Sequence, residues 1–133
     1  MAANFDAEWE RGRDRLSDSL RGQLERGRAI SALDYQKALA RMPMVNEALT
    51  EIYSNYDAIL TPSTAGTAPR GLDSTGDPAF CTLWTYCGMP ALNLPLMTGA
   101  NGLPLGVQLV GPRMGDARLL RTARWLTGTL VQN

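Results

Sequence analysis

Few side chains in this sequence could carry out acid–base or nucleophilic chemistry. The 133 residues contain no His, one Lys (Lys37) and two Cys (Cys81 and Cys87). Without an imidazole, the chain cannot build a Ser-His-Asp or Cys-His relay. Zinc loses its commonest nitrogen ligand, and two cysteines are too few for an all-cysteine site. The sequence therefore predicts no metal site and no cofactor.

The remaining reactive groups are interpreted as structural. Cys81 and Cys87 are six residues apart, so on a helix their side chains would project about 240° apart and would neither bridge nor chelate. We predict buried free thiols, as in a reducing compartment. Lys37 falls on a predicted helix, where a solvated or salt-bridging lysine is expected rather than a general base.

Composition indicates a globular chain of one-domain length. Apolar residues make up 44% and charged residues 20%, and thirteen cations balance thirteen anions. This balance gives no electrostatic argument for a nucleic-acid partner or a membrane surface. The N-terminus has no signal-peptide core, and no apolar run approaches the roughly 20 residues of a membrane span. We expect a cytoplasmic protein that binds neither nucleic acid nor membrane.

The first half of the chain should be helical. A polar, Arg-rich helix is predicted within residues 1–30, with glycines that weaken it and interleaved acids that favour a solvated face over nucleic-acid binding. A long helix is predicted over 31–56, because Ser31 and Asp34 resemble a capping box. Pro43 lies inside its pattern and should kink the helix or split it in two.

Residues 57–133 should form strand, loop, helix, hairpin and helix. A short strand around Ala58–Leu60 leads into a loop over 61–76 that is long enough to line or cover a site. Asp77 and Pro78 are typical of an N-cap and a first helical residue, and Gly88 of a left-handed end. A final helix should begin at Asp116, with an inner face of Leu119, Leu120, Ala123 and Leu126 and an outer face of Arg118, Arg121 and Arg124.

The hairpin is the least ordinary part of the sequence. The stretches "PALNLPL" and "LPLGVQLV" flank "TGANG", a turn rich in Gly and Asn. Continuous apolarity in both stretches predicts strands that are buried on both faces, with helices above and below the sheet. We therefore expect an α/β fold with short strands of a mixed sheet covered by helices.

Three stretches, in order, resemble the C-terminal region of the amidase signature family: "YDAILTPSTAGTAP", "GDPAFCTLWTYCGMPALNLPL" and "GLPLGVQLVGPRMGDARLLRTARWL". The resemblance covers the chain from Ser31 and identifies 1–133 as a single C-terminal segment of the amidase signature fold. It implies hydrolysis of amide C–N bonds by a Ser nucleophile, a second Ser held by a cis peptide and a Lys base. The family's Gly/Ser-rich loop is absent from this sequence, and Lys37 is not where the family places its lysine.

The resemblance therefore implies a segment without catalytic residues of its own. Ser74, in "GLDSTG", has no base partner. The loop and the helix after it would lie beside the substrate channel, which assigns contacts with a small amide substrate to Thr75, Gly76, Asp77, Phe80, Trp84 and Thr85. The alternative roles are structural: Asp77 fits an N-cap, and Phe80 and Trp84, four residues apart, fit core packing.

Two functions stay open from the sequence. The chain could contribute sheet core and substrate channel to an amidase while being inactive alone, completed by an N-terminal partner chain. Alternatively it could be a non-catalytic module that associates with itself as a homo-oligomer or completes a partner, because a sheet severed from its neighbours exposes unpaired edges and apolar surface.

Overall fold

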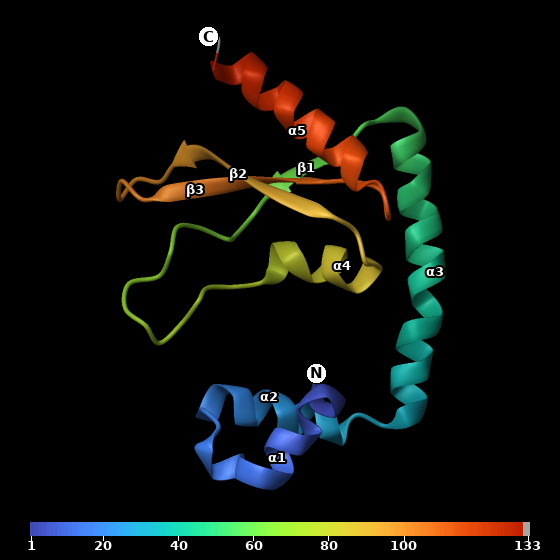
Figure 1. The fold of residues 1–133 in the computed structure, drawn as a ribbon, viewed down its shortest axis with the longest axis vertical. Helices are drawn as coiled ribbons and strands as arrows, with labels where there is room; N and C mark the ends of the chain where they lie inside the picture. The colour runs from blue at the N-terminus through green and yellow to red at the C-terminus, as the bar shows by residue number, and fades with distance from the viewer. Residues whose placement is uncertain (132–133) are drawn as a thin grey trace. The chain divides into compact units, whose positions relative to one another are not determined.

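The computed structural model describes residues 1–131 and divides into two compact units, Met1–Arg41 and a second that begins at Met42. The first unit holds η1 (Ala2–Phe5), α1 (Asp6–Gly12), η2 (Arg13–Arg15), α2 (Asp18–Ala29) and the start of α3 (Ala32–Asn55). The second holds the end of α3, β1 (Ile59–Pro62), α4 (Ala79–Cys87), β2 (Ala91–Thr98), β3 (Pro104–Val110) and α5 (Asp116–Val131). Figure 1 shows these elements in chain order.

The single helix predicted within residues 1–30 is wrong, because the chain breaks at Leu16 and Ser17. Leu16 is extended, with φ −77° and ψ 145°, and the Ser17 hydroxyl accepts a hydrogen bond from the Leu20 N–H at 3.3 Å. A serine in this position satisfies an orphan N–H of a new helix and so ends the preceding one. Two helices, α1 and α2, result.

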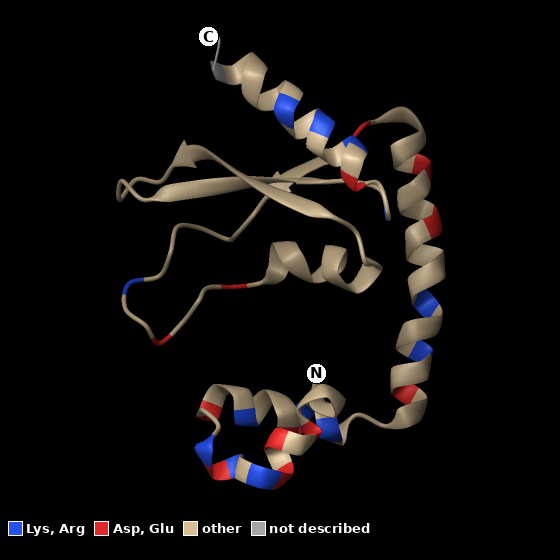
Figure 2. Ribbon diagram, viewed as in Figure 1, with Lys and Arg blue, Asp and Glu red and all other residues tan. Residues whose placement is uncertain are grey.

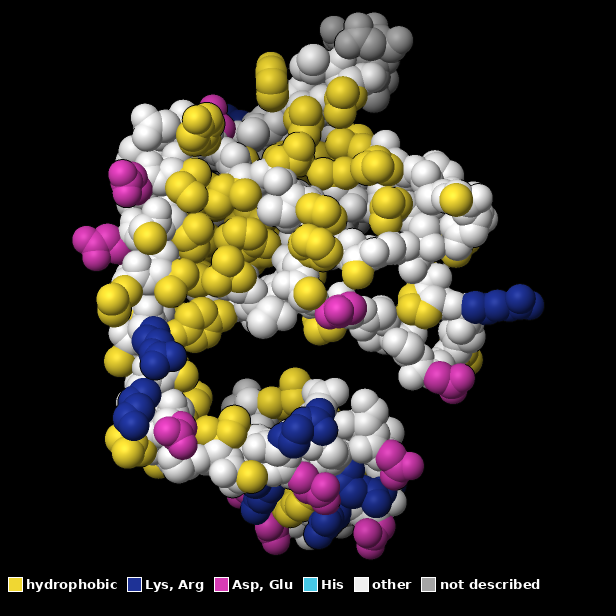
Figure 3. Space-filling view, turned by 180° about the vertical axis from the view of Figure 1, so that it is seen from behind, with side chains coloured by type: hydrophobic (Ala, Val, Ile, Leu, Met, Phe, Trp, Pro, Cys, Tyr) yellow, Lys and Arg dark blue, Asp and Glu magenta, His cyan; other side chains and the backbone are white. Residues whose placement is uncertain are grey.

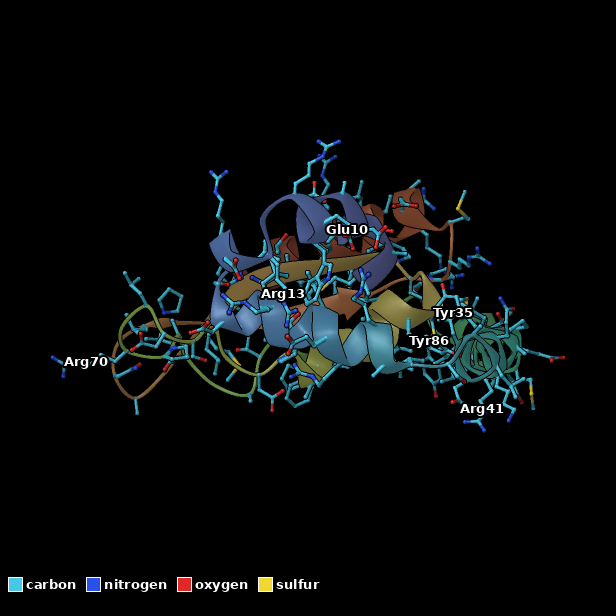
Figure 4. All side chains as sticks on the ribbon, turned by 90° about the horizontal axis from the view of Figure 1, so that it is seen from below. Glu10, Arg13, Tyr35, Arg41, Arg70 and Tyr86 are labelled. Carbon is cyan, nitrogen blue, oxygen red and sulfur yellow. The ribbon has the colours of Figure 1, made fainter. Side chains whose placement is uncertain are left out.

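Charged residues in this first unit pair with one another. The Arg28 guanidinium bonds the Asp6 carboxylate at 2.7 Å, and Arg13 bonds Glu25 at 2.6 Å. Both guanidinium groups also lie over the ring of Trp9, at 5.1 and 4.5 Å from its centroid. Blue and red segments alternate along these helices in Figure 2, and Glu10 and Arg13 are labelled in Figure 4.

The long helix α3 starts at the predicted cap and is not split. Ser31 accepts from the Asp34 N–H at 3.0 Å and donates to the Asp34 carboxylate at 2.7 Å. Pro43 lies within the 24-residue helix, although a proline removes one backbone donor.

The sheet has three strands in the order β1-β3-β2, and both pairings are antiparallel. No strand residue is charged, as Figure 2 shows. Pro62 ends the edge strand β1, and Pro95 lies in the edge strand β2 where the register shifts between Leu94 and Met97. Both prolines thus occupy edge or irregular positions, where a missing N–H costs no ladder bond.

Helices cover both faces of the central strand β3. Val110 packs with Tyr53 of α3 and with Cys87 and Met89 at the end of α4. Leu109, the preceding residue, packs on the opposite face against Leu94 and, from α5, Leu119 and Ala123. Successive strand residues point to opposite faces, so one strand supplies both clusters. The α/β class is confirmed, with α5 and α4 on opposite sides of the sheet in Figure 1. The expected mixed sheet is not: the three described strands pair only antiparallel, because β2 and β3 form a hairpin and β1 runs opposite to β3.

Burial on both faces does not extend to the edge strand β2, where Leu96 and Met97 are exposed. On α5, Leu119 and Ala123 are buried as predicted, but Leu120 is 59% exposed and so does not belong to the inner face. Figure 3 shows hydrophobic side chains gathered over the sheet-bearing part of the chain. This unit therefore presents more apolar surface than its own helices cover.

The C-terminal end of α4 and one of the two cysteines are as predicted. Gly88 ends α4 in the left-handed region, with φ 64° and ψ 36°, as expected. Both cysteines are free, but only Cys87 is buried; Cys81 is exposed, contrary to expectation. Burial raises the pKa of the Cys87 thiol. No helix within residues 1–131 is both long enough and apolar enough to cross a bilayer.

Tyr53 belongs to the buried cluster with Cys87, Met89 and Val110. Its burial predicts that the protein loses stability at alkaline pH. Its hydroxyl donates to the Val110 carbonyl at 3.1 Å. Burial raises the Tyr53 pKa from 10.0 to about 12, although nearby Arg118 opposes the rise. Between these pH values the unfolded chain loses the phenolic proton while the folded chain keeps it, so stability falls as pH rises; below pH 10 this contribution is fully present.

Tyr53→Phe tests this account. We expect the variant to lose about 1 kcal/mol of unfolding free energy at neutral pH, because the Val110 carbonyl loses its donor. It should also lose less stability than the wild type between neutral and strongly alkaline pH. Urea unfolding at a series of pH values measures both effects. Tyr56→Phe, at an exposed tyrosine, is the control; an equal change in its alkaline profile would contradict the account.

Candidate functional site

A polar cavity of about 470 Å³ lies between the β1–α4 loop and the sheet. Residues from the beginning of the loop, from its end and from β2 and β3 line it, among them Ser63, Thr64, Thr67, Thr75, Gly76, Asp77, Asn93 and Gly106. Five of the fourteen lining residues carry a hydroxyl or an amide and Asp77 a carboxylate; the others are Ala, Gly and Pro. The cavity therefore offers hydrogen-bonding groups supported on one side by regular strands.

Three long-range hydrogen bonds hold the beginning of the loop against the sheet. The Ser63 N–H donates to the Gly106 carbonyl at 3.1 Å, and the Ser63 hydroxyl donates to the Asn93 side-chain oxygen. Further along, the Asn101 amide in the β2–β3 turn donates to the Thr67 hydroxyl at 2.9 Å. The tip of the loop makes no such contact at Arg70, which extends outward in Figure 4.

Gly106 makes room for the Ser63–Asn93 pair. A Cβ at this position would lie 2.0 Å from the Asn93 side-chain oxygen and 2.9 Å from the Ser63 hydroxyl. Because those contacts are with side-chain ends, Asn93 could swing aside, but only by breaking its bond to Ser63. The glycine is thus needed for the polar pair at the cavity floor.

Gly106→Ala should lower the free energy of unfolding by about 1–2 kcal/mol, the cost of overpacking and of a lost hydrogen bond. Gly66→Ala is a matched control from the same cavity, because a Cβ there meets nothing within 4 Å; it should change stability by less than about 0.5 kcal/mol. Thermal unfolding of the two variants compares them. Equal losses would show that the space at Gly106 is not needed.

The structure brings three of the six predicted substrate residues together. Thr75, Gly76 and Asp77 line the cavity described above. Gly76 has a φ of +94°, and its N–H donates to the Ser74 hydroxyl at 3.1 Å. The Asp77 carboxylate accepts from the Ala79 N–H at 2.9 Å. Helix α4 begins at Ala79, one residue later than predicted, so Asp77 supports the helix start while still facing the cavity.

The other three predicted residues lie elsewhere on α4. Phe80 lines a neighbouring, more apolar cavity of about 490 Å³, together with Leu60, Pro62 and Met97. Trp84 is half-buried and packs against the Tyr53 cluster, while Thr85 is exposed. The assignment of all six residues to substrate contact stays a prediction, and Trp84 has a packing role in this structure.

The polar cavity offers hydroxyl and amide hydrogen-bonding groups and one carboxylate. Asp77 is the one charged residue that lines it. Lys37 is exposed on the part of α3 that belongs to the first unit. Within residues 1–131, no group of three or more His, Cys, Asp and Glu side chains is arranged to hold a metal ion.

Sequence reasoning missed Ser63, Asn93 and Gln108 as site-forming residues. Gln108 is buried in β3 and donates to atoms at both ends of the loop. A signal was present: Asn93 and Gln108 are polar residues inside the apolar stretches of β2 and β3. Gln108 is buried and a buried polar residue needs a partner, but the partner is not visible in the sequence.

The arrangement of the sheet and its covering helices is that of amidase signature enzymes. The structure resembles a crystal structure of an amidase, with a TM-score of 0.79 and 25% identity over 96% of this chain and 32% of that chain. A bacterial aryl acylamidase of the amidase signature family shares the fold, with a TM-score of 0.64.

A family model described as Amidase matches residues 4–120. The chain belongs to the amidase family. A glutamyl-tRNA(Gln) amidotransferase subunit from Brevibacillus brevis is 32% identical over 96 residues, or 67% of this chain and 20% of that protein. The corresponding subunit from Thermotoga maritima is 34% identical over 97 residues. The chain thus spans about a fifth of the length of these relatives.

Proposed function

We propose that this chain forms part of the substrate channel of an amide hydrolase, together with the sheet beneath it, and does not hydrolyse amides alone. The observation that carries the proposal is the cavity of about 470 Å³ whose lining combines hydroxyls, an amide and one carboxylate. Such groups can orient an amide by hydrogen bonds, whereas no lining residue can serve as the Lys base of the family.

In this role, Thr75, Gly76 and Asp77 would contact a small amide substrate, and Phe80, Trp84 and Thr85 would contribute from α4. The remainder of the active site would come from a further polypeptide segment. Two findings support this: the chain matches 32% of the amidase chain that it resembles, and the relatives named above are themselves called subunits.

We place the protein in the cytoplasm, as the sequence predicts.

The test combines turnover with binding. The purified chain is assayed on a simple aryl amide, and the same amide is titrated into labelled protein while backbone amide NMR signals are followed. We expect no turnover above background and shifts confined to residues around Thr75–Asp77, reduced in Asp77→Asn. Robust turnover that survives substitution of Ser63, Ser74 and Lys37 would contradict the proposal, as would amide-induced shifts that are unchanged in Asp77→Asn.

A second candidate function is a module that associates with itself or completes a partner. It is favoured by the open edges of the sheet: β1 and β2 are both edge strands, and Leu60 and Met97 on them are 59% and 53% exposed. Size-exclusion chromatography with light scattering distinguishes the candidates. A monodisperse monomer that melts cooperatively would argue against this second function.

A further inference from the structure

We propose that Gln108 is a positioning residue that fixes both ends of the β1–α4 loop and thereby shapes the polar cavity. The inference rests on the proposed function, because it is that function which makes the loop part of a substrate channel. Its physical content, a single side chain that ties two distant segments to the central strand, can be tested without any enzymatic activity.

Gln108 is a polar residue in an apolar setting. It lies in the central strand β3 and is 4% exposed. Its side-chain nitrogen donates to the Thr61 hydroxyl at 2.9 Å and to the Pro62 carbonyl at 3.2 Å, at the end of β1. The same nitrogen donates to the Phe80 carbonyl, in the first turn of α4, at 2.6 Å. The contacts therefore lie immediately before and immediately after the loop of residues 63–78.

The number of N–H donors explains why a glutamine amide is suited to this position. A glutamine nitrogen carries two N–H donors, and here it faces three acceptors, so one donor is shared. Two of the acceptors are backbone carbonyls, which cannot donate; the nitrogen rather than the oxygen must therefore face them. A carboxylate would place acceptors against acceptors, and an aliphatic side chain would leave the two part-buried carbonyls without this donor.

Two other side-chain hydrogen bonds at the start of α4 stay within the loop and the helix start. The Cys81 thiol, a poor donor, lies 3.6 Å from the Ser63 carbonyl. The Asp77 carboxylate bonds the Ala79 N–H within its own segment. Neither of these bonds reaches β3, whereas Gln108 bonds the Phe80 carbonyl directly from that strand. Phe80 lies three residues after Asp77, which lines the cavity.

Gln108→Met tests the inference because methionine keeps the length of the side chain and removes the donor. Amide hydrogen exchange of the full chain is measured at two sets of sites. The first set lies at the loop ends: the Ser63 N–H, which bonds Gly106, and the Cys81 and Thr82 N–H groups, which bond Pro78. The second set is the paired amides of β2 and β3. Exchange reports local opening separately from global unfolding.

We expect exchange at the loop ends to accelerate by about tenfold while the β2–β3 amides change by less than about threefold. Leu109→Ala is the matched control: Leu109 is also 4% exposed, is the next residue in the same strand and faces the other cluster. It should accelerate both sets together. A Gln108→Met pattern like that of the control, or no acceleration at the loop ends, would overturn the proposal.

Thr61→Val provides a second, milder variant that removes one acceptor of the same amide. It should accelerate the loop-end amides by about threefold and leave the β2–β3 amides unchanged; no change at either set would overturn the proposal even if Gln108→Met fails to fold. Because no substrate is used, failure of the amide-binding test above would leave this result standing, and the reverse holds as well.

Discussion

Leu109→Ala is expected to lower the free energy of unfolding of the sheet-bearing unit by about 2–5 kcal/mol. Leu109 is 4% exposed and packs against Leu94, Leu119 and Ala123, so the cluster between the sheet and α5 is built around it. Truncation removes apolar contacts and leaves a cavity that the antiparallel strands on either side cannot fill. Small domains have only about 5–15 kcal/mol in total, so the loss is large.

Leu60→Ala is the control for this prediction. Leu60 pairs directly with Leu109 across the β1–β3 ladder, yet its side chain is 59% exposed. The same chemical change should therefore cost less than about 0.5 kcal/mol. Urea unfolding followed by circular dichroism measures both variants. Equal losses at the two positions would mean that Leu60 is covered in solution, which would favour the self-associating module.

Arg118→Met should cost about 2–3 kcal/mol, the second largest effect expected. The Arg118 guanidinium donates to the carbonyls of Tyr53 and Tyr56 at 3.1 and 3.0 Å, at the C-terminal end of α3, and to Asp57 at 3.2 Å. The last carbonyls of a helix have no partner within it, and a cation also complements the helix dipole there. Methionine keeps much of the aliphatic stem and removes all three bonds.

Arg121→Met separates this effect from a general loss of charge on α5, because Arg121 is exposed on the same helix. Its substitution should change stability by less than about 0.5 kcal/mol. The Asp57 contact is largely exposed and contributes little by itself, so Asp57→Asn should resemble the control. Thermal melts of the three variants test the account; a loss in Asp57→Asn as large as in Arg118→Met would assign the effect to the ion pair instead.

Arg118 also shows where sequence reasoning reaches its limit. The periodicity of α5 correctly predicted Leu119 and Ala123 on the inner face, but it placed Arg118 on the outer face and Leu120 inside. A helical period of 3.6 residues defines which residues share a side of a helix. It does not define how far the neighbouring sheet extends, or whether a second helix ends nearby and offers free carbonyls.

Local chemistry was readable wherever a feature depends on residues close in the chain. The capping of α3 by Ser31, the left-handed glycine at the end of α4 and the β2–β3 hairpin are of this kind, since each is determined within a few residues. The break at Ser17 is also local, yet the apolar residues Phe5, Trp9, Leu16, Leu20 and Leu24 recur across it at helical spacing and concealed the cap. The resemblance to the amidase family likewise required only the order of short stretches.

What the sequence determined by itself was therefore the family, the order of the elements from Ser31 onward and the absence of an imidazole; what only the tertiary structure decided was which residues meet. Thr75, Gly76 and Asp77 share a cavity with Ser63 and Asn93, while Trp84 packs into a core cluster instead. Gln108 reaches Thr61 and Phe80, which are 47 and 28 residues away. Such contacts depend on how the strands pair and the helices pack, and those long-range interactions leave no spacing in the sequence from which they could be predicted.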